Sequence, residues 1–163
     1  MIIIVMGLPG SGKSFFASHF AKALQAAYLS SDQIREEMKL RGRYSEEVKM
    51  KVYREMMRRA TAELANFPIL ILDASFSKKK YRELARELAD KTGEELHFIE
   101  MKADEEEIRQ RVAQSRKYSE ADEDVYQKMK QQYEKLSEEH LTLNSSRYDV
   151  QKLIKKAKSH LKI

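Results

Sequence analysis

The chain has 163 residues, of which 42% are hydrophobic, and it carries a formal net charge of +5. This size suits one domain with a substantial buried core, so we expect a single domain over residues 1–163. The absence of cysteine excludes disulfides and thiolate metal sites, and a cytoplasmic location is expected. The apolar run at residues 1–6 is too short for a signal peptide or a membrane span, so we expect no membrane partner. The sequence does not indicate an oligomeric state.

A glycine-rich loop follows this apolar run, which we expect to form the first strand. Its residues match the phosphate-binding pattern GxxxxGK[ST]: Gly7, Leu8, Pro9, Gly10, Ser11, Gly12, Lys13 and Ser14. Glycines let successive N–H groups turn toward one anion, and the helix that follows adds the positive end of its dipole. Lys13 is expected to reach the β and γ phosphates of a nucleotide, and the Ser14 hydroxyl to bind Mg²⁺. A glycine-rich turn without a ligand is the alternative, and the preceding strand argues against it.

The second expected strand, residues 27–30, leads directly into a helix. Ser30 and Gln33 have the spacing of a capping box, and Asp32 falls in the first helical turn. Asp32 could simply complement the helix dipole. Because ligands bind at the carboxyl ends of parallel strands, it could instead accept the proton of an attacking hydroxyl group, with Arg35 binding the acceptor. The residues alone leave both interpretations open.

Positive charge is concentrated between residues 33 and 59, where nine basic residues stand against five acidic ones, and again at 78–86. We predict an anionic acceptor near these segments, with Arg43 among its contacts. Solvated helix faces are the alternative explanation for any single lysine. Apolar residues that recur every four positions also predict a long amphipathic helix with a buried stripe at Val48, Val52, Met56, Ala60 and Leu64.

The third expected strand, residues 68–74, is aliphatic on both faces, as in a central strand covered by helices on both sides. Asp73 lies at its end and would come to rest beside the glycine-rich loop. There it could hold Mg²⁺ directly or through water, as a Walker-B acid does. A helix cap or a turn acid is the alternative role for this residue.

An arginine-rich segment follows the fourth expected strand, residues 96–103, and we expect it to form a lid at about residues 109–122. One of its arginines could close over the transferring phosphoryl group. Arg109 and Arg111 each have a glutamate four residues earlier, and therefore a ready surface ion pair. Arg116 has none, so it is the preferred lid arginine, with Arg111 second.

The last expected strand, residues 140–143, precedes a helical pattern that runs to Leu161. Strands and helices thus alternate along the whole chain. This alternation predicts an α/β fold with a five-stranded parallel sheet and helices on both faces.

Several stretches together carry a family resemblance: GLPGSGKS, SDQIR, RGRYSEEVKMKVY, LILDASF and the RQRVAQSR and SEAD region. They resemble the P-loop kinase family related to polynucleotide 5′-hydroxyl kinases and zeta toxins, over nearly the whole chain. The resemblance implies the three-layer P-loop kinase fold, ATP, Mg²⁺ and transfer of the γ phosphate to a hydroxyl group. It implies that Asp32 activates the acceptor, Arg35 contacts it, Asp73 is the Walker-B-like acid and Arg116 is a lid arginine.

The nucleotide side of the site contains one departure from this family. Relatives usually have Thr directly after the P-loop serine, where this chain has Phe15. Loss of a hydroxyl contact to the α phosphate should change affinity without preventing binding, because backbone N–H groups remain. The resemblance also implies that Asn144 and Arg147 lie near the adenine. ATP is expected rather than GTP, since no NKxD stretch occurs in the chain.

The leading hypothesis is an ATP-dependent kinase. Lys13 and a lid arginine would neutralise the phosphoryl group, Ser14 and Asp73 would bind Mg²⁺, and Asp32 would position the acceptor hydroxyl. The acceptor could be the 5′-hydroxyl of a nucleic acid, because basic residues cluster on the acceptor side, or a small phosphorylated or sugar-like metabolite. The alternative from another class is an ATP-binding switch or ATPase without a dedicated acceptor.

Overall fold

The computed structural model describes the backbone of residues 1–115 and 120–163 and the side chains of residues 1–111 and 126–163. Strands and helices alternate in this part of the chain, which confirms the predicted α/β class. The strands are β1 (Ile2–Met6), β2 (Ala27–Ser30), β3 (Leu70–Asp73), β4 (Leu96–Lys102) and β5 (Leu141–Asn144). The helices are α1 (Lys13–Leu24), α2 (Ser31–Glu37), α3 (Glu46–Leu64), α4 (Lys79–Thr92), α5 (Glu105–Ser115), α6 (Glu120–Gln131) and α7 (Val150–Leu161).

The five strands of the described chain form one parallel sheet in the order β2-β3-β1-β4-β5. The central strand is β1, in which Ile4 is aligned with Leu72 of β3 on one side and with Phe98 of β4 on the other. Since all strands run in the same direction, their carboxyl ends share one edge. The chain moves from β1 to one half of the sheet and later returns to the other half. In open α/β sheets such a switch point is where ligands bind.

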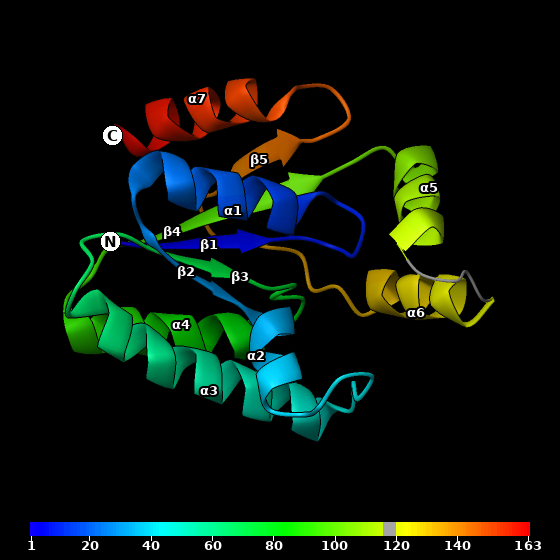
Figure 1. The fold of residues 1–163 in the computed structure, drawn as a ribbon, viewed down its shortest axis with the longest axis horizontal. Coiled ribbons are helices and arrows are strands. Elements are labelled where there is room, and N and C mark those ends of the chain that lie inside the picture. Colours follow the sequence, from blue (N-terminus) through cyan, green and yellow to red (C-terminus); the bar gives the residue numbers. More distant parts are fainter. Residues whose placement is uncertain (116–119) are drawn as a thin grey trace.

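Helices cover both faces of the sheet, with α1 and α7 on one face and α3 and α4 on the other (Figure 1). Ile3 and Val5 of β1 are buried in a cluster with α1 and α7, whereas Ile2, Ile4 and Met6 are buried with α2, α3 and α4. Successive side chains of a strand point to opposite faces. A strand covered on both sides must therefore be apolar throughout, and this explains why the first strand has no polar residue.

The predicted stripe of α3 is buried from Val48 through Val52 and Met56 to Ala60, whereas Leu64, its last member, is only partly buried. The helix begins after Ser45, whose hydroxyl accepts a hydrogen bond from the Val48 N–H at 3.3 Å. This cap satisfies one of the N–H groups that every helix start leaves without a partner.

The predicted capping box at Ser30 is wrong. Ser30 occupies the N-cap position of α2, but its side chain accepts no hydrogen bond from the helix. The residue is buried at the end of β2, where its hydroxyl interacts with Tyr28. Burial raises the pKa of Tyr28, and this contact lowers it in part.

Hydropathy gives no sign of a bilayer segment: among the described residues, no helix is both long and apolar enough to cross a membrane.

Candidate active site

The loop after β1 has a glycine with positive φ at each of its two ends, a backbone region that other residues rarely adopt. Gly7 has φ of 148°, and a Cβ atom there would lie 2.5 Å from the Met101 carbonyl oxygen. Gly12 has φ of 81°, and a Cβ atom there would lie 3.0 Å from Ser145 Oγ. Gly12 also precedes α1, which has no side-chain cap. The first N–H groups of α1 are therefore free to bind an anion, such as the phosphates of a nucleotide.

Asp73 is brought to this loop by the register of the sheet, because β1 and β3 align it with Val5. The residue is 1% exposed, and its Oδ2 accepts a hydrogen bond from the Tyr28 hydroxyl at 2.7 Å. Its Oδ1 is buried and has no hydrogen-bond partner among the described residues. Burial raises the pKa of Asp73, while Lys13, Ser14 and Tyr28 act to lower it.

These groups fit a bound Mg²⁺ ion. Mg²⁺ prefers hard oxygen ligands and usually binds through one or two carboxylates together with water and substrate phosphates. The free Oδ1 of Asp73 and the Ser14 hydroxyl supply such ligands. Within the described residues there is no group of three or more His, Asp or Glu side chains that could hold a metal alone. An ion at Asp73 would therefore share its coordination with the phosphates of the nucleotide.

The loop after Asp73 is held in a strained conformation. Phe76 is fully buried and has φ of 44°, in the left-handed region that residues other than glycine rarely adopt. Its N–H donates to Tyr53 Oη at 2.8 Å, and its carbonyl oxygen accepts from Arg82 Nη1 at 3.0 Å. Side chains of α3 and α4 thus fix the path of the chain as it leaves Asp73. Strain of this kind persists where the surrounding structure determines it from several sides.

Asp32 lies in the first turn of α2 and is exposed. Its negative charge adds to the effect of burial in raising the pKa of Asp73, so the two carboxylates are within electrostatic reach. Sequence analysis predicted both residues for one site, and the structure brings them to the same edge of the sheet. Asp32 remains accessible to a substrate in solution.

Arg35 was predicted to bind the acceptor, but most of its contacts are with the protein itself. It is buried, and its Nη1 donates to the Arg43 carbonyl oxygen at 2.9 Å. Its guanidinium carbon lies 4.8 Å from the centre of the Tyr44 ring, and its buried Nε has no partner among the described residues. The Arg43 side chain is exposed. Arg35 therefore organises the loop between α2 and α3 and leaves one donor free.

Arg111 reaches the P-loop as well as forming its predicted ion pair. Its Nη2 pairs with Glu107, and its Nη1 donates to the Gly10 carbonyl oxygen at 3.2 Å and to Ser145 Oγ at 2.8 Å. The predicted ion pair with Glu107 is therefore confirmed, and the same arginine also contacts the P-loop. Arg116, which the sequence favoured, lies outside the described residues.

The end of β5 is tied to the same loop. Ser145 Oγ donates to the Ser11 carbonyl oxygen at 3.0 Å. The Asn144 amide is already hydrogen-bonded: its Nδ2 donates to Asp104 Oδ1, after β4, at 3.2 Å, and its Oδ1 accepts from the Ser146 N–H at 2.8 Å. Arg147 is exposed. These contacts place the loop after β5 beside the P-loop.

Phe15 lies at the start of α1 with its side chain 61% exposed, and its ring centre is 4.3 Å from that of His19. Sequence analysis missed two other contributors to the site, Tyr28 and Ser145. Neither belongs to a recognisable motif, and each acts through a partner more than 40 residues away. Only the position of Ser145 after a strand, where ligands gather in parallel sheets, could have singled it out.

Solved structures that share this fold include three kinases. The sugar kinase of Janibacter sp. HTCC2649 is 21% identical, with a TM-score of 0.73 over 99% of this chain and 94% of that one. The APS kinase CysC of Mycobacterium tuberculosis, solved with AMPPNP and APS, is 20% identical, with a TM-score of 0.76 over 99% and 97% of the two chains. The gluconokinase of Sinorhizobium meliloti 1021 is 17% identical, with a TM-score of 0.75 over 99% and 90%. At this level of identity the likeness establishes the fold.

A match to a protein family covers more than four fifths of the chain. It extends over residues 2–136, from β1 through the P-loop, the Asp73 loop and the helices α5 and α6. The chain therefore belongs to the AAA domain family.

Proposed function

We propose that the protein transfers the γ phosphate of ATP to a hydroxyl group of a small-molecule acceptor. One observation carries the proposal: the glycine loop before α1, Lys13, Ser14 and an unpaired oxygen of Asp73 lie together at the carboxyl edge of the sheet. The names of the neighbours that share the fold, a sugar kinase, an APS kinase and a gluconokinase, support the same activity.

The chemical step needs positioned charges more than covalent chemistry. The acceptor oxygen forms a bond to the γ phosphorus, the bond to the bridging oxygen of ADP breaks, and the hydroxyl proton passes to Asp32. Lys13 and the N–H groups of α1 neutralise charge on the phosphates. Arg111, already bonded to the loop, is proposed to steady the P-loop and to meet the developing charge. Bound Mg²⁺ would add further charge neutralisation at the phosphate oxygens held by Ser14 and Asp73.

A small acceptor is favoured over a nucleic acid because the basic segments use much of their charge internally. Lys78, whose side chain is 22% exposed, pairs with Glu46 at 3.1 Å. Arg82 is buried and donates to two carbonyl oxygens. A surface for a polynucleotide backbone would need such cations free to face phosphates. The relation to polynucleotide kinases and zeta toxins stays a prediction from the sequence.

The test is transfer of labelled γ phosphate from ATP to a panel of acceptors that contains small hydroxylated metabolites and a 5′-hydroxyl oligonucleotide. We expect label on a metabolite, and loss of at least about 10²-fold of the rate in Lys13→Ala and Asp32→Asn, because each removes a charged or proton-accepting group from the transition state. Lys22→Ala, on the same helix as Lys13, and Asp90→Asn, an exposed acid on α4, are the matched controls.

Each outcome separates the hypotheses. Label on the oligonucleotide alone would reject the small acceptor and favour a polynucleotide kinase. Release of phosphate to water that is unaffected by Asp32→Asn would favour an ATPase or switch. Full activity in Lys13→Ala would contradict the whole proposal.

A further inference from the structure

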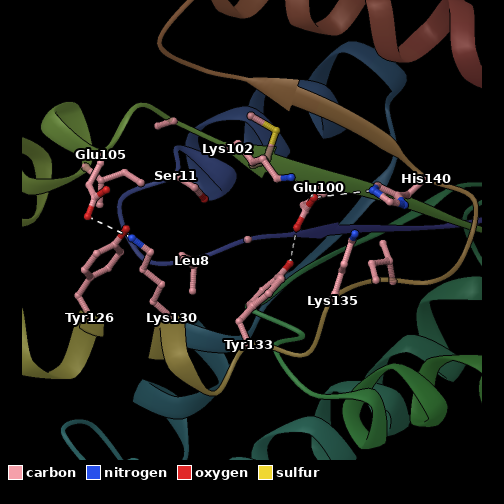
Figure 2. A pocket seen from close by; sticks show the side chains of 15 residues that line it. Leu8, Ser11, Glu100, Lys102, Glu105, Tyr126, Lys130, Tyr133, Lys135 and His140 are labelled. Atoms are coloured by element: carbon pink, nitrogen blue, oxygen red, sulfur yellow. Dashed lines mark hydrogen bonds and ion pairs between the residues drawn. The ribbon is translucent and has the colours of Figure 1, made fainter. Parts of the chain in front are cut away.

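A cavity of about 440 Å³ opens under the first residues of the P-loop (Figure 2). Its walls include Gly7 and Leu8, the end of β4 from Glu100 to Ala103, and residues of the segment that runs from Tyr133 to His140. Residues of α5 and α6 complete it. Lys13, Ser14 and Asp73 are not among its lining residues. This volume is typical of a site for a small molecule.

The cavity lies on the acceptor side of the P-loop. Glu100 follows Phe98 by two residues on β4, so both side chains share the face that packs against α2, α3 and α4. Burial raises the pKa of Tyr53 to about 12, and the charge of Asp32 adds to this rise. Burial and Glu100 raise the pKa of Tyr133, and Tyr53 adds to it. Tyr133 and Leu136, which line the cavity, pack in the same buried cluster as Ile34 of α2, the helix that carries Asp32.

The floor of the cavity is polar and suited to hydroxyl groups. The Glu100 side chain is 9% exposed; its Oε1 accepts from the Tyr133 hydroxyl at 2.8 Å, and its Oε2 lies 3.0 Å from Lys102 Nζ. His140 Nδ1 lies 2.7 Å from the Glu138 carbonyl oxygen, which can only accept, so this nitrogen carries the proton. His140 Nε2 then faces Glu100 Oε2 at 3.7 Å. A ligand hydroxyl can bond to either atom.

One buried polar atom of the lining has no partner among the described residues. Ser11 lines the cavity, and its Oγ is buried with no hydrogen-bond partner among the described residues. Buried polar atoms are almost always paired in proteins. A hydroxyl group of a bound ligand would supply the missing partner.

The rim of the cavity is cationic. Lys135 is exposed and has no ion-pair partner within the part of the chain that the structure describes. Lys102 and Lys130 are paired with Glu100 and Glu105, but their side chains are 57% and 46% exposed. The Lys130–Glu105 pair is exposed on both sides and therefore weak, so Lys130 can turn toward a ligand at little cost, and the Lys102 ammonium keeps further donors beyond its contact with Glu100. An anionic group on the ligand would therefore be held at the rim.

We propose that this cavity binds the phosphate acceptor, and that the acceptor is a small polyhydroxylated anion, such as a sugar acid or a sugar phosphate. The inference rests on the proposed phosphotransfer. Hydroxyl groups of the acceptor bond to Glu100, His140 and Ser11, and its anionic end lies at Lys135 and Lys102. The reacting hydroxyl gives its proton to Asp32 as the oxygen bonds to the γ phosphorus and ADP leaves.

The test is calorimetric titration of the intact protein with D-gluconate, which has both features, with sorbitol, which has hydroxyls alone, and with hexanoate, which has charge alone. We expect gluconate to bind at least about tenfold more tightly than either, because a hydrogen bond to a charged group contributes that much. Glu100→Gln and Lys135→Ala should each weaken gluconate binding about tenfold or more. Glu87→Gln and Lys155→Ala, exposed residues on α4 and α7, are the controls.

ATP binding is titrated separately on each protein, so that the two proposals can fail independently. A wild-type protein that does not bind ATP would overturn the proposed function. If the protein binds ATP, three results would each overturn the cavity as the acceptor site. The protein could bind all three probes with equal affinity, or it could fail to bind gluconate. Gluconate affinity could also be unchanged in both Glu100→Gln and Lys135→Ala. Lys135 is on the surface, so its replacement tests the site even if Glu100→Gln does not fold.

Discussion

Burial of the Asp73 carboxylate opposes folding, yet the same carboxylate is proposed to bind Mg²⁺. Its pKa is raised by burial above the ordinary value of 3.8, so the folded protein binds its proton more tightly than the unfolded chain does. The stability linked to this carboxyl is therefore full below pH 3.8 and is lost as pH rises through the higher folded pKa. Above that folded pKa, the ionised and buried carboxylate is expected to destabilise the ligand-free protein.

We therefore predict that Asp73→Asn raises the melting temperature of the ligand-free protein at pH 7, and that this gain shrinks or reverses toward pH 4 as the wild-type carboxyl takes up a proton. The same substitution should abolish the Mg²⁺ dependence of ATP binding, because it removes the anionic oxygen that would face the ion. Melting curves from pH 4 to 8 and calorimetry with and without Mg²⁺ measure the two effects. An unchanged Mg²⁺ dependence would remove Asp73 from the metal site.

Gly7 shows what the P-loop requires of its first residue. We predict that Gly7→Ala destabilises the protein by about 1–3 kcal/mol more than Gly42→Ala. Both glycines have positive φ, but a Cβ atom at Gly7 would lie 2.5 Å from a backbone oxygen, whereas at Gly42 nothing lies within 4 Å. Urea denaturation of the two variants measures the difference. Equal losses would mean that the Met101 strand end can move away at no cost.

Among the elements, α3 and α4 are joined at one end by a single carboxylate. Glu46, at the start of α3, accepts hydrogen bonds from Lys80 at 2.6 Å and from the Tyr81 hydroxyl at 3.0 Å, and it pairs with Lys78 at 3.1 Å. The hydrogen bonds with Lys80, Lys78 and Tyr81 lower the pKa of Glu46 from 4.5 to about 2. A folded pKa below the unfolded one means stability that is present above pH 4.5 and is lost as pH falls toward 2.

Glu46→Gln should therefore destabilise the protein at neutral pH, and the difference from the wild type should shrink between pH 4.5 and about 2. Because Glu46 is partly exposed, solvent screening keeps the effect small. The matched control is Glu47→Gln, which breaks only a local pair with Lys51 on the same helix. Acid titrations of the melting temperature would contradict the prediction if the Glu46→Gln difference were constant with pH.

At the scale of the whole molecule, the two buried clusters lie on opposite faces of one sheet, and β1 contributes side chains to both. We predict one cooperative thermal transition for residues 1–163, as for a single domain. Mg²⁺-ATP at 100 times its dissociation constant should stabilise the protein by about 2.7 kcal/mol and raise the melting temperature by roughly 5–10 °C. Calorimetry on the wild type and Lys13→Ala tests this, with the shift expected to vanish in the variant. Two transitions, of which only one responds to nucleotide, would contradict a single domain.

The local patterns of the sequence predicted most of the fold because they report burial. The apolar residues of β1 and β3 indicated strands covered on both faces, and the stripe from Val48 to Ala60 indicated a helix with one buried face. Capping was less predictable, since the Ser30 spacing fitted a capping box that does not form. Its buried hydroxyl interacts instead with Tyr28, two residues earlier on the same strand, and spacing alone does not show which of the two interactions forms.

The sequence by itself determined the glycine loop, its lysine and serine, the acid just after β2 and the acid that ends β3, because each is part of a short pattern at the end of a strand. Only the tertiary structure decided that Tyr28 holds Asp73, that Arg111 reaches Gly10, and that Glu100 and His140 face one cavity. These contacts join residues tens of positions apart, and they depend on strand order and register. Order and register are set by packing of the whole chain, so no local pattern records them.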